Sequence, residues 1–125
     1  MVIRNAPLLD DGTPMPTLYW LVGRSVRLAV DRLEAAGGVR RAEAAVGVAE
    51  LREAHSAYAR ERDRLLPAGW EGPVPSGGVG GTRVGVKCLH AHYAWFLAGG
   101  DDPVGRWVDT ALSEERDPPA REGAR

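Results

Sequence analysis

The chain has 125 residues, of which 44% are hydrophobic and 26% charged, and its formal net charge is -1. This length supports one hydrophobic core, in a composition typical of globular domains. The near-neutral charge argues against a dedicated nucleic-acid binder, and no apolar run is long enough to span a bilayer or form a secretory signal. The single cysteine excludes an internal disulfide and a four-cysteine zinc site. We therefore expect a small cytoplasmic domain.

Residues 2–22 are predicted to form a β-hairpin. Its turn signal is Asp10-Asp11-Gly12, because glycine adopts positive φ at no steric cost. Pro14 and Pro16 keep the next stretch extended, and the aromatic and branched residues of 17–22 favour a strand. An isolated hairpin is marginally stable in water, so it must pack against other elements.

Two helices are expected next. Ser25 is the predicted N-cap of the first, and Gly37-Gly38 ends it. Its apolar stripe, at helical spacing, comprises Val26, Ala29, Val30 and Leu33. The second helix is predicted over about 43–66, with a narrow seam suited to one neighbour or to a second copy of the chain. The seam comprises Val48, Leu51, His55, Tyr58, Arg62 and Leu65.

The C-terminal half contains a loop and two further helices. Residues 67–82 are rich in Gly and Pro and predict a linker or adaptable loop. A third helix is expected over 84–98, and Asp102 is a favourable N-cap for a fourth. Residues 113–125 lack large apolar side chains and are expected to form a disordered tail.

The segment 87–92, KCLHAH, is the densest group of chemically reactive residues. If it is helical, Cys88 and His92 share one face at i and i+4, whereas His90 points about 200° away. Two ligands do not make a stable zinc site, which needs three or four. The outside ligands available are His55, Asp11 and Asp101. We expect no metal or other cofactor here: Cys88 is interpreted as a small buried residue and His92 as a core histidine, with zinc on this pair as the alternative.

The same half of the chain offers two other kinds of chemistry. A nucleophilic Cys88 would need Lys87 or His92 to favour its thiolate, together with an oxyanion site that the sequence lacks. Gly80-Gly81 could hold an anion with help from Arg83 and Lys87, although the stretch is no Walker loop. We favour a flexible linker over the anion site.

The N-terminal turn is a further candidate. Asp11, Thr13 and Thr17 lie in DGTPMPT, which could present a rigid binding edge. The favoured interpretation is a hairpin turn with a stiff exit.

Three segments carry a family resemblance: DGTPMPTLYWL at 11–21, LEAAGGV at 33–39 and GVKCLHAHYAWFLAGGDDPVGRWV at 85–108. Over roughly residues 2–112 the chain resembles the domain of unknown function 501 family, small bacterial proteins of unassigned activity. The resemblance implies gene neighbours that encode a septum-formation initiator and an exopolyphosphatase. It therefore suggests, by association, a protein partner in cell division or polyphosphate metabolism.

The chain departs from the family pattern in its cysteines. The resemblance implies a Cys-x-Cys-Gly motif before the hairpin and a Thr-Cys-Pro after the aromatic strand, which with the Lys-Cys-Leu-His cysteine could form a thiolate metal site. Here the chain begins at Met1, Leu21-Val22-Gly23 stands at the second motif, and only Cys88 remains. Loss of the site in this branch, a truncated start and the absence of any such site are three explanations that stay open.

The sequence thus predicts an α+β fold, a single domain over residues 2–112 in which an N-terminal hairpin packs on three or four helices. The favoured function is a non-enzymatic binding or interaction module, and the seam of the second helix suggests a homodimer as its assembly. The alternative is a metal- or phosphate-binding enzyme centred on Cys88, His90 and His92.

Overall fold

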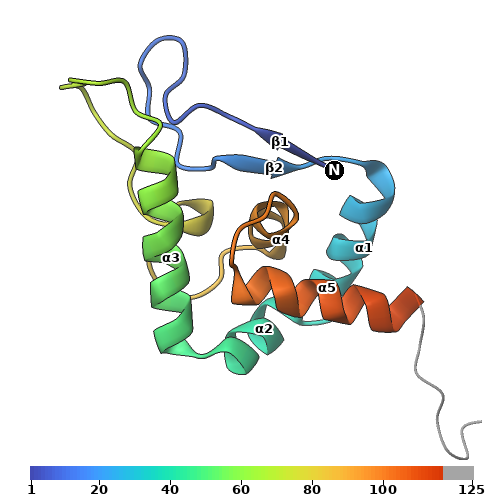
Figure 1. The fold of residues 1–125 in the computed structure, drawn as a ribbon. Coiled ribbons are helices and arrows are strands. Elements are labelled where there is room, and N and C mark those ends of the chain that lie inside the picture. Colours follow the sequence, from blue (N-terminus) through green and yellow to red (C-terminus); the bar gives the residue numbers. More distant parts are fainter. Residues whose placement is uncertain (117–125) are drawn as a thin grey trace, which may run out of the picture.

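A computed structural model describes residues 1–116 as a two-stranded hairpin with five α-helices, which confirms the predicted α+β class. Helix α4 lies at the centre, with the hairpin above it, α3 and α1 on its two sides and α5 across it (Figure 1). None of the helices within these residues is long and apolar enough to cross a membrane. The elements are β1 (Val2–Arg4), β2 (Tyr19–Leu21), α1 (Arg24–Ala35), α2 (Gly38–Val46), α3 (Val48–Asp63), the 3-10 turn η1 (Val79–Gly81), α4 (Leu89–Leu97) and α5 (Pro103–Arg116).

The hairpin forms where it was predicted. Its strands are antiparallel, with Ile3 opposite Trp20. At the turn, Gly12 has φ 86° and the Thr13 N–H donates to Asp11 Oδ1 at 3.0 Å. This local hydrogen bond closes an Asx turn, which explains why the favoured interpretation of the segment, a hairpin turn, is the structure it adopts.

The first helix has the expected apolar stripe but a different start. Val30 and Leu33 are buried, with Val26 and Ala29 packed against the same core. The N-cap is Gly23 and makes no side-chain cap hydrogen bond, so the prediction that Ser25 caps this helix is wrong. Two residues separate β2 from this helix, which begins two residues earlier than the sequence indicated.

The expected second helix is two helices, because Gly47 separates α2 from α3. Gly47 has φ 87° and ψ 160°, which no helix interior allows and which glycine adopts without a Cβ clash. The chain also re-enters a helix at Gly38, earlier than predicted, so the single span 43–66 is wrong at its start and at its middle.

The seam of α3 faces the chain's own core. Leu51, His55, Tyr58 and Arg62 are all buried, and only the two end residues of the seam are exposed. Arg62 donates from Nη1 to the Pro16 carbonyl at 3.1 Å, and the Leu18 N–H donates to Tyr58 Oη at 2.6 Å. The buried residues of the seam therefore hold the segment that leads into β2. This face of α3 is not free to bind a second copy of the chain.

The predicted third helix begins later than expected, at Leu89 instead of residue 84. Residues 82–88 form an irregular loop with several bends, and the Val86 N–H in it donates to Glu43 Oε2 at 2.7 Å. Upstream, the segment 67–82 contains one 3-10 turn, in which Val79 is buried against α3. The Gly/Pro-rich segment is thus a loop, but its last residues are fastened to the core.

The fourth helix starts as predicted and runs further. Asp102 accepts the Val104 N–H at Oδ1 (2.9 Å), and Pro103 occupies the first helical position. The helix continues to Arg116, so the expectation of a disordered tail from 113 is wrong for 113–116. Residues 117–125 lie outside the described part of the chain.

Candidate functional site

A cavity of about 640 Å³ opens between β2, α1 and the residues that precede α4. One wall is formed by β2 and the residue after it. The facing wall is polar and comes from α1 and from the start of α4. The lining residues are Thr17, Tyr19, Trp20, Leu21, Val22, Arg27, Asp31, Gly80, Lys87, Cys88, His90 and Ala91.

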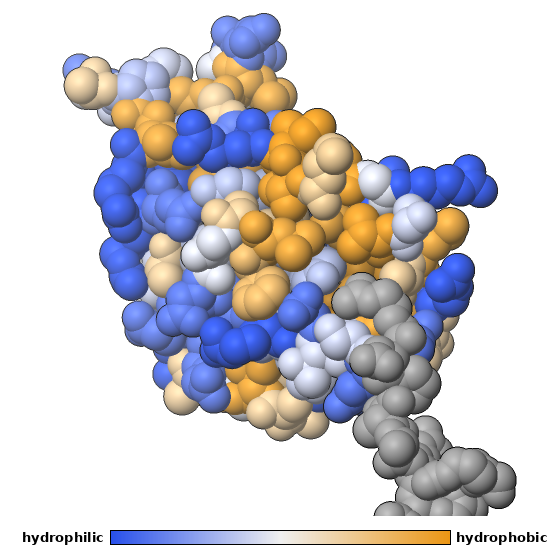
Figure 2. Space-filling model, turned by 45° about the vertical axis from the view of Figure 1, so that its right-hand side comes forward, coloured by the Kyte–Doolittle hydropathy of each residue, from blue (hydrophilic) through white to orange (hydrophobic). Residues whose placement is uncertain are grey.

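The apolar wall is part of a larger exposed apolar surface. Trp20 is 45% exposed and Ile3, its partner across the hairpin, is 54% exposed. Figure 2 shows apolar side chains gathered on the upper part of the molecule, at the height of the hairpin, while hydrophilic side chains dominate the lower part. A concave site with an apolar wall and a few convergent polar groups is the usual form of a small-ligand site.

Tyr19 closes one end of this wall. Its hydroxyl donates to Glu61 Oε2, and burial followed by the Glu61 carboxylate raises the pKa of Tyr19 to about 12. The phenol therefore stays neutral at physiological pH, and in the cavity Tyr19 contributes an apolar surface.

His90 is the best-connected polar group of the cavity. Its Nε2 lies 2.8 Å from Asp31 Oδ1 and its Nδ1 lies 3.2 Å from Glu34 Oε2. Both carboxylates come from α1, one helical turn apart. The ring is 27% exposed, so it is reachable from the cavity and held in orientation at the same time.

Glu34 also sets where α4 begins. Its Oε2 accepts the Leu89 N–H at 2.7 Å, and Cys88 is the N-cap in an extended conformation without a side-chain cap bond. A carboxylate at a helix N-terminus satisfies a free N–H and complements the helix dipole. The start of α4 is thus determined by a residue of another helix.

Because α4 begins at Leu89, the predicted pairing of Cys88 with His92 on one helix face is wrong. Cys88 precedes the helix, so the i, i+4 geometry does not apply to it. His92 is fully buried, and its Nδ1 lies 2.6 Å from Oδ2 of Asp102, which is also fully buried. His92 is therefore a core histidine, as the favoured interpretation held, and it is absent from the cavity lining, whereas Cys88 and His90 are only partly buried.

His55 packs beside His92, with ring centroids 5.8 Å apart. The Val79 N–H donates to His55 Nδ1 at 3.0 Å, so the proton is on Nε2, which donates to the Gly85 carbonyl at 2.7 Å. Burial is the main cause that lowers the pKa of His55. This histidine pins the loop before α4, and both of its ring nitrogens are already used.

The family model described as "Protein of unknown function (DUF501)" matches residues 1–110. The chain belongs to the DUF501 family. No curated protein and no solved structure matches it. The comparisons thus confirm the resemblance that the three sequence segments indicated, and the DUF501 match brings no assigned activity with it.

In this DUF501 chain the structure brings together half of the predicted site residues. Thr17, Lys87, Cys88 and His90 all line the cavity. The others lie elsewhere: Asp11 and Thr13 in the hairpin turn, Arg83 in a separate hollow beside α3, and His92 in the core.

Sequence reasoning missed the contribution of α1 to the DUF501 site. Arg27 and Asp31 line the cavity, and Glu34 lies directly behind it. A signal was present, since positions 27, 31 and 34 are spaced by four and three residues and so share one helix face. This spacing indicated a polar face on the helix, but it could not show which other segment packs against that face.

Proposed function

We propose that this protein is a non-enzymatic binding module, and that its cavity takes a small ligand with an apolar body and an anionic group. The volume of about 640 Å³ lies in the range of small-molecule sites, roughly 300–1,000 Å³. The apolar body would pack on the β2 wall, against Trp20 and Leu21.

The observation that carries the proposal is a pair of cations at this cavity without anionic partners. Arg27 and Lys87 both line it, and neither forms an ion pair with any side chain in residues 1–115. Asp31, the lining carboxylate, is engaged by His90. A planar guanidinium from α1 and an ammonium from the segment before α4, both on the polar wall, suit a phosphate or carboxylate bound in the cavity.

Nuclear magnetic resonance titrations test this with three probes: phenyl phosphate, inorganic phosphate and benzyl alcohol. Phenyl phosphate carries both parts of the proposed ligand, and each of the others carries one. We expect phenyl phosphate to bind most tightly and to shift the backbone amide signals of β2 and residues 87–91.

The variants Arg27→Gln and Lys87→Gln should each weaken phenyl phosphate binding about tenfold, since each removes a charge-assisted hydrogen bond. Arg24→Gln and Arg83→Gln are the matched controls, because both are exposed cations that do not line the cavity. Equal losses in controls and test variants, or signal shifts confined to other surfaces, would overturn the proposal.

A further inference from the structure

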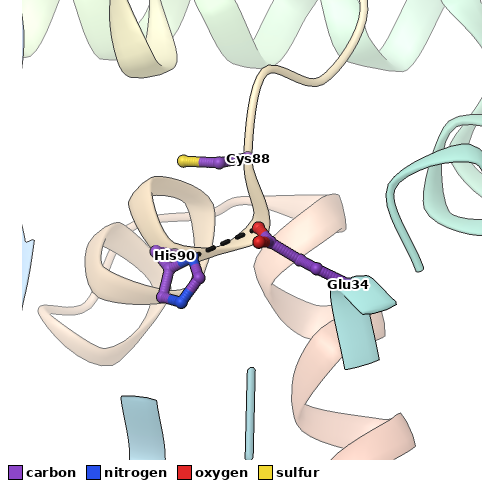
Figure 3. A group of neighbouring side chains, drawn as sticks. All are labelled: Glu34, Cys88 and His90. Atoms are coloured by element: carbon purple, nitrogen blue, oxygen red, sulfur yellow. Dashed lines mark hydrogen bonds and ion pairs between the residues drawn. The ribbon is translucent and has the colours of Figure 1, made fainter. Parts of the chain in front are cut away.

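Three potential metal ligands meet at the polar wall of the cavity. Figure 3 shows Glu34 reaching from α1 toward the start of α4, where Cys88 and His90 lie two residues apart. The carboxylate oxygen, the sulfur and the ring nitrogen all lie within 4.8 Å of one another. Each of the three side chains is partly buried, so the group is neither an exposed acidic cluster nor a closed core.

The placement of the His90 ring between two carboxylates supplies a second observation. Its Nε2 lies 2.8 Å from Asp31 Oδ1, and this contact orients the ring so that Nδ1 is directed toward Glu34. Nδ1 lies 3.2 Å from Glu34 Oε2, which is close to the separation of two ligand atoms on one tetrahedral zinc ion.

The surrounding hydrogen bonds are those of a metal-binding histidine. Such a histidine typically donates its other N–H to a carboxylate, which fixes the tautomer and the ring orientation. Asp31 Oδ1 lies at hydrogen-bond distance from His90 Nε2, where it can take this role, and the Leu89 N–H holds the Glu34 carboxylate in place at 2.7 Å. Glu34 retains its other oxygen and further lone pairs for a cation.

We propose that Glu34, Cys88 and His90 bind one zinc-class divalent ion, with the remaining coordination position open to the cavity. Carboxylate, thiolate and imidazole are the ligand types of zinc, and three protein ligands with one open position are a common arrangement. Tetrahedral zinc sets its ligand atoms about 3.4–3.8 Å apart, so side-chain rotations suffice to close the present separations. Binding would release the thiol proton to solvent.

This site goes beyond the proposed binding function and does not depend on it, because it needs neither Arg27 nor Lys87. It also differs from the metal pair that the sequence suggested. His90 replaces His92, and Glu34 enters from a helix more than fifty residues away along the chain.

Cobalt titration of the reduced full chain tests the site directly, with no phosphate or phenyl phosphate present. We expect one Co²⁺ per chain, a thiolate-to-cobalt charge-transfer band, intense visible bands of tetrahedral geometry, and displacement by Zn²⁺. Cys88→Ser should abolish the charge-transfer band. Glu34→Gln keeps an oxygen for the Leu89 N–H, so this variant should fold and yet bind cobalt weakly.

Asp31→Asn tests the positioning role, and we expect it to weaken affinity about 10–100-fold while the charge-transfer band persists at saturation. Glu53→Gln is the matched control, since this carboxylate is exposed and distant from the group. Circular dichroism checks that each variant is folded.

Either of two results would overturn the metal site: a cobalt spectrum unchanged by Cys88→Ser, or no cobalt binding by the folded, reduced chain. Because phenyl phosphate is measured separately, failure of cobalt binding leaves the anion proposal standing, and the converse also holds.

Discussion

Asp102 performs two structural tasks with one buried carboxylate, which makes Asp102→Ala the most informative stability variant. Its Oδ1 accepts the Val104 N–H at 2.9 Å and caps α5, and its Oδ2 lies 2.6 Å from His92 Nδ1. Loss of an N-cap costs about 1 kcal/mol. Removal of one partner from a buried carboxylate–imidazole contact, like removal of one partner from a buried ion pair, costs about 3–5 kcal/mol, because the other partner is left unsatisfied.

The two losses share one carboxylate and are not additive, so we expect Asp102→Ala to lower the free energy of unfolding by about 3–5 kcal/mol. Asp102→Asn retains an oxygen for the Val104 N–H and should lose less, about 1–3 kcal/mol. The control is Asp101→Ala. Asp101 is exposed and pairs with Arg106 at 2.9 Å, and a surface pair contributes about 1 kcal/mol or less.

Urea unfolding, followed by tryptophan fluorescence and by circular dichroism, measures these differences as midpoint shifts at constant slope. A loss of 3–5 kcal/mol is a large part of the 5–15 kcal/mol typical of a domain, so Asp102→Ala should be marginally folded at 37 °C. The reasoning is refuted if Asp102→Ala and Asp101→Ala lose equal stability, or if the asparagine variant is as unstable as the alanine variant.

Three further outcomes follow from the packing and the titrating groups. Gly105→Ala should destabilise by about 1–3 kcal/mol in urea despite alanine's better helix propensity, because the added Cβ would lie 2.3 Å from Phe96 Cβ. The lowered pKa of His55 makes the unfolded state bind more protons. Unfolding midpoints should therefore fall as pH drops below about 6.5, the unfolded pKa, and His55→Gln should show a smaller fall. Absorbance titration should place Tyr19 ionisation near pH 12, and Glu61→Gln should lower this pKa; a pKa near 10 in the parent protein would contradict the buried hydrogen bond.

Much of the local structure could be predicted because its causes lie within a few residues. The Asp11–Gly12 turn depends on a side chain bonding two residues ahead and on a glycine with positive φ. The start of α5 at Asp102-Pro103 depends equally on neighbours in the chain. The apolar stripe of α1 follows from helical periodicity alone, which is why its buried face was predicted correctly.

The boundaries that were wrong depend on contacts between distant segments. Nothing near Cys88 indicates that α4 begins after it, because the N–H that starts this helix is satisfied by Glu34. The break at Gly47 likewise costs little locally, and it allows α2 to pack on α1 and α5 while α3 packs on η1 as well as on α5.

The sequence by itself determined the fold class, the family, the hairpin turn and four of the residues that line the cavity. Only the tertiary structure decided which of them act together, since it sent His92 to the core and set His90 between two carboxylates of α1. The physical reason is the distance along the chain over which each kind of interaction acts. Backbone propensities and caps act over a few residues, whereas a binding site is an arrangement of side chains from distant segments, whose positions depend on how the whole core packs.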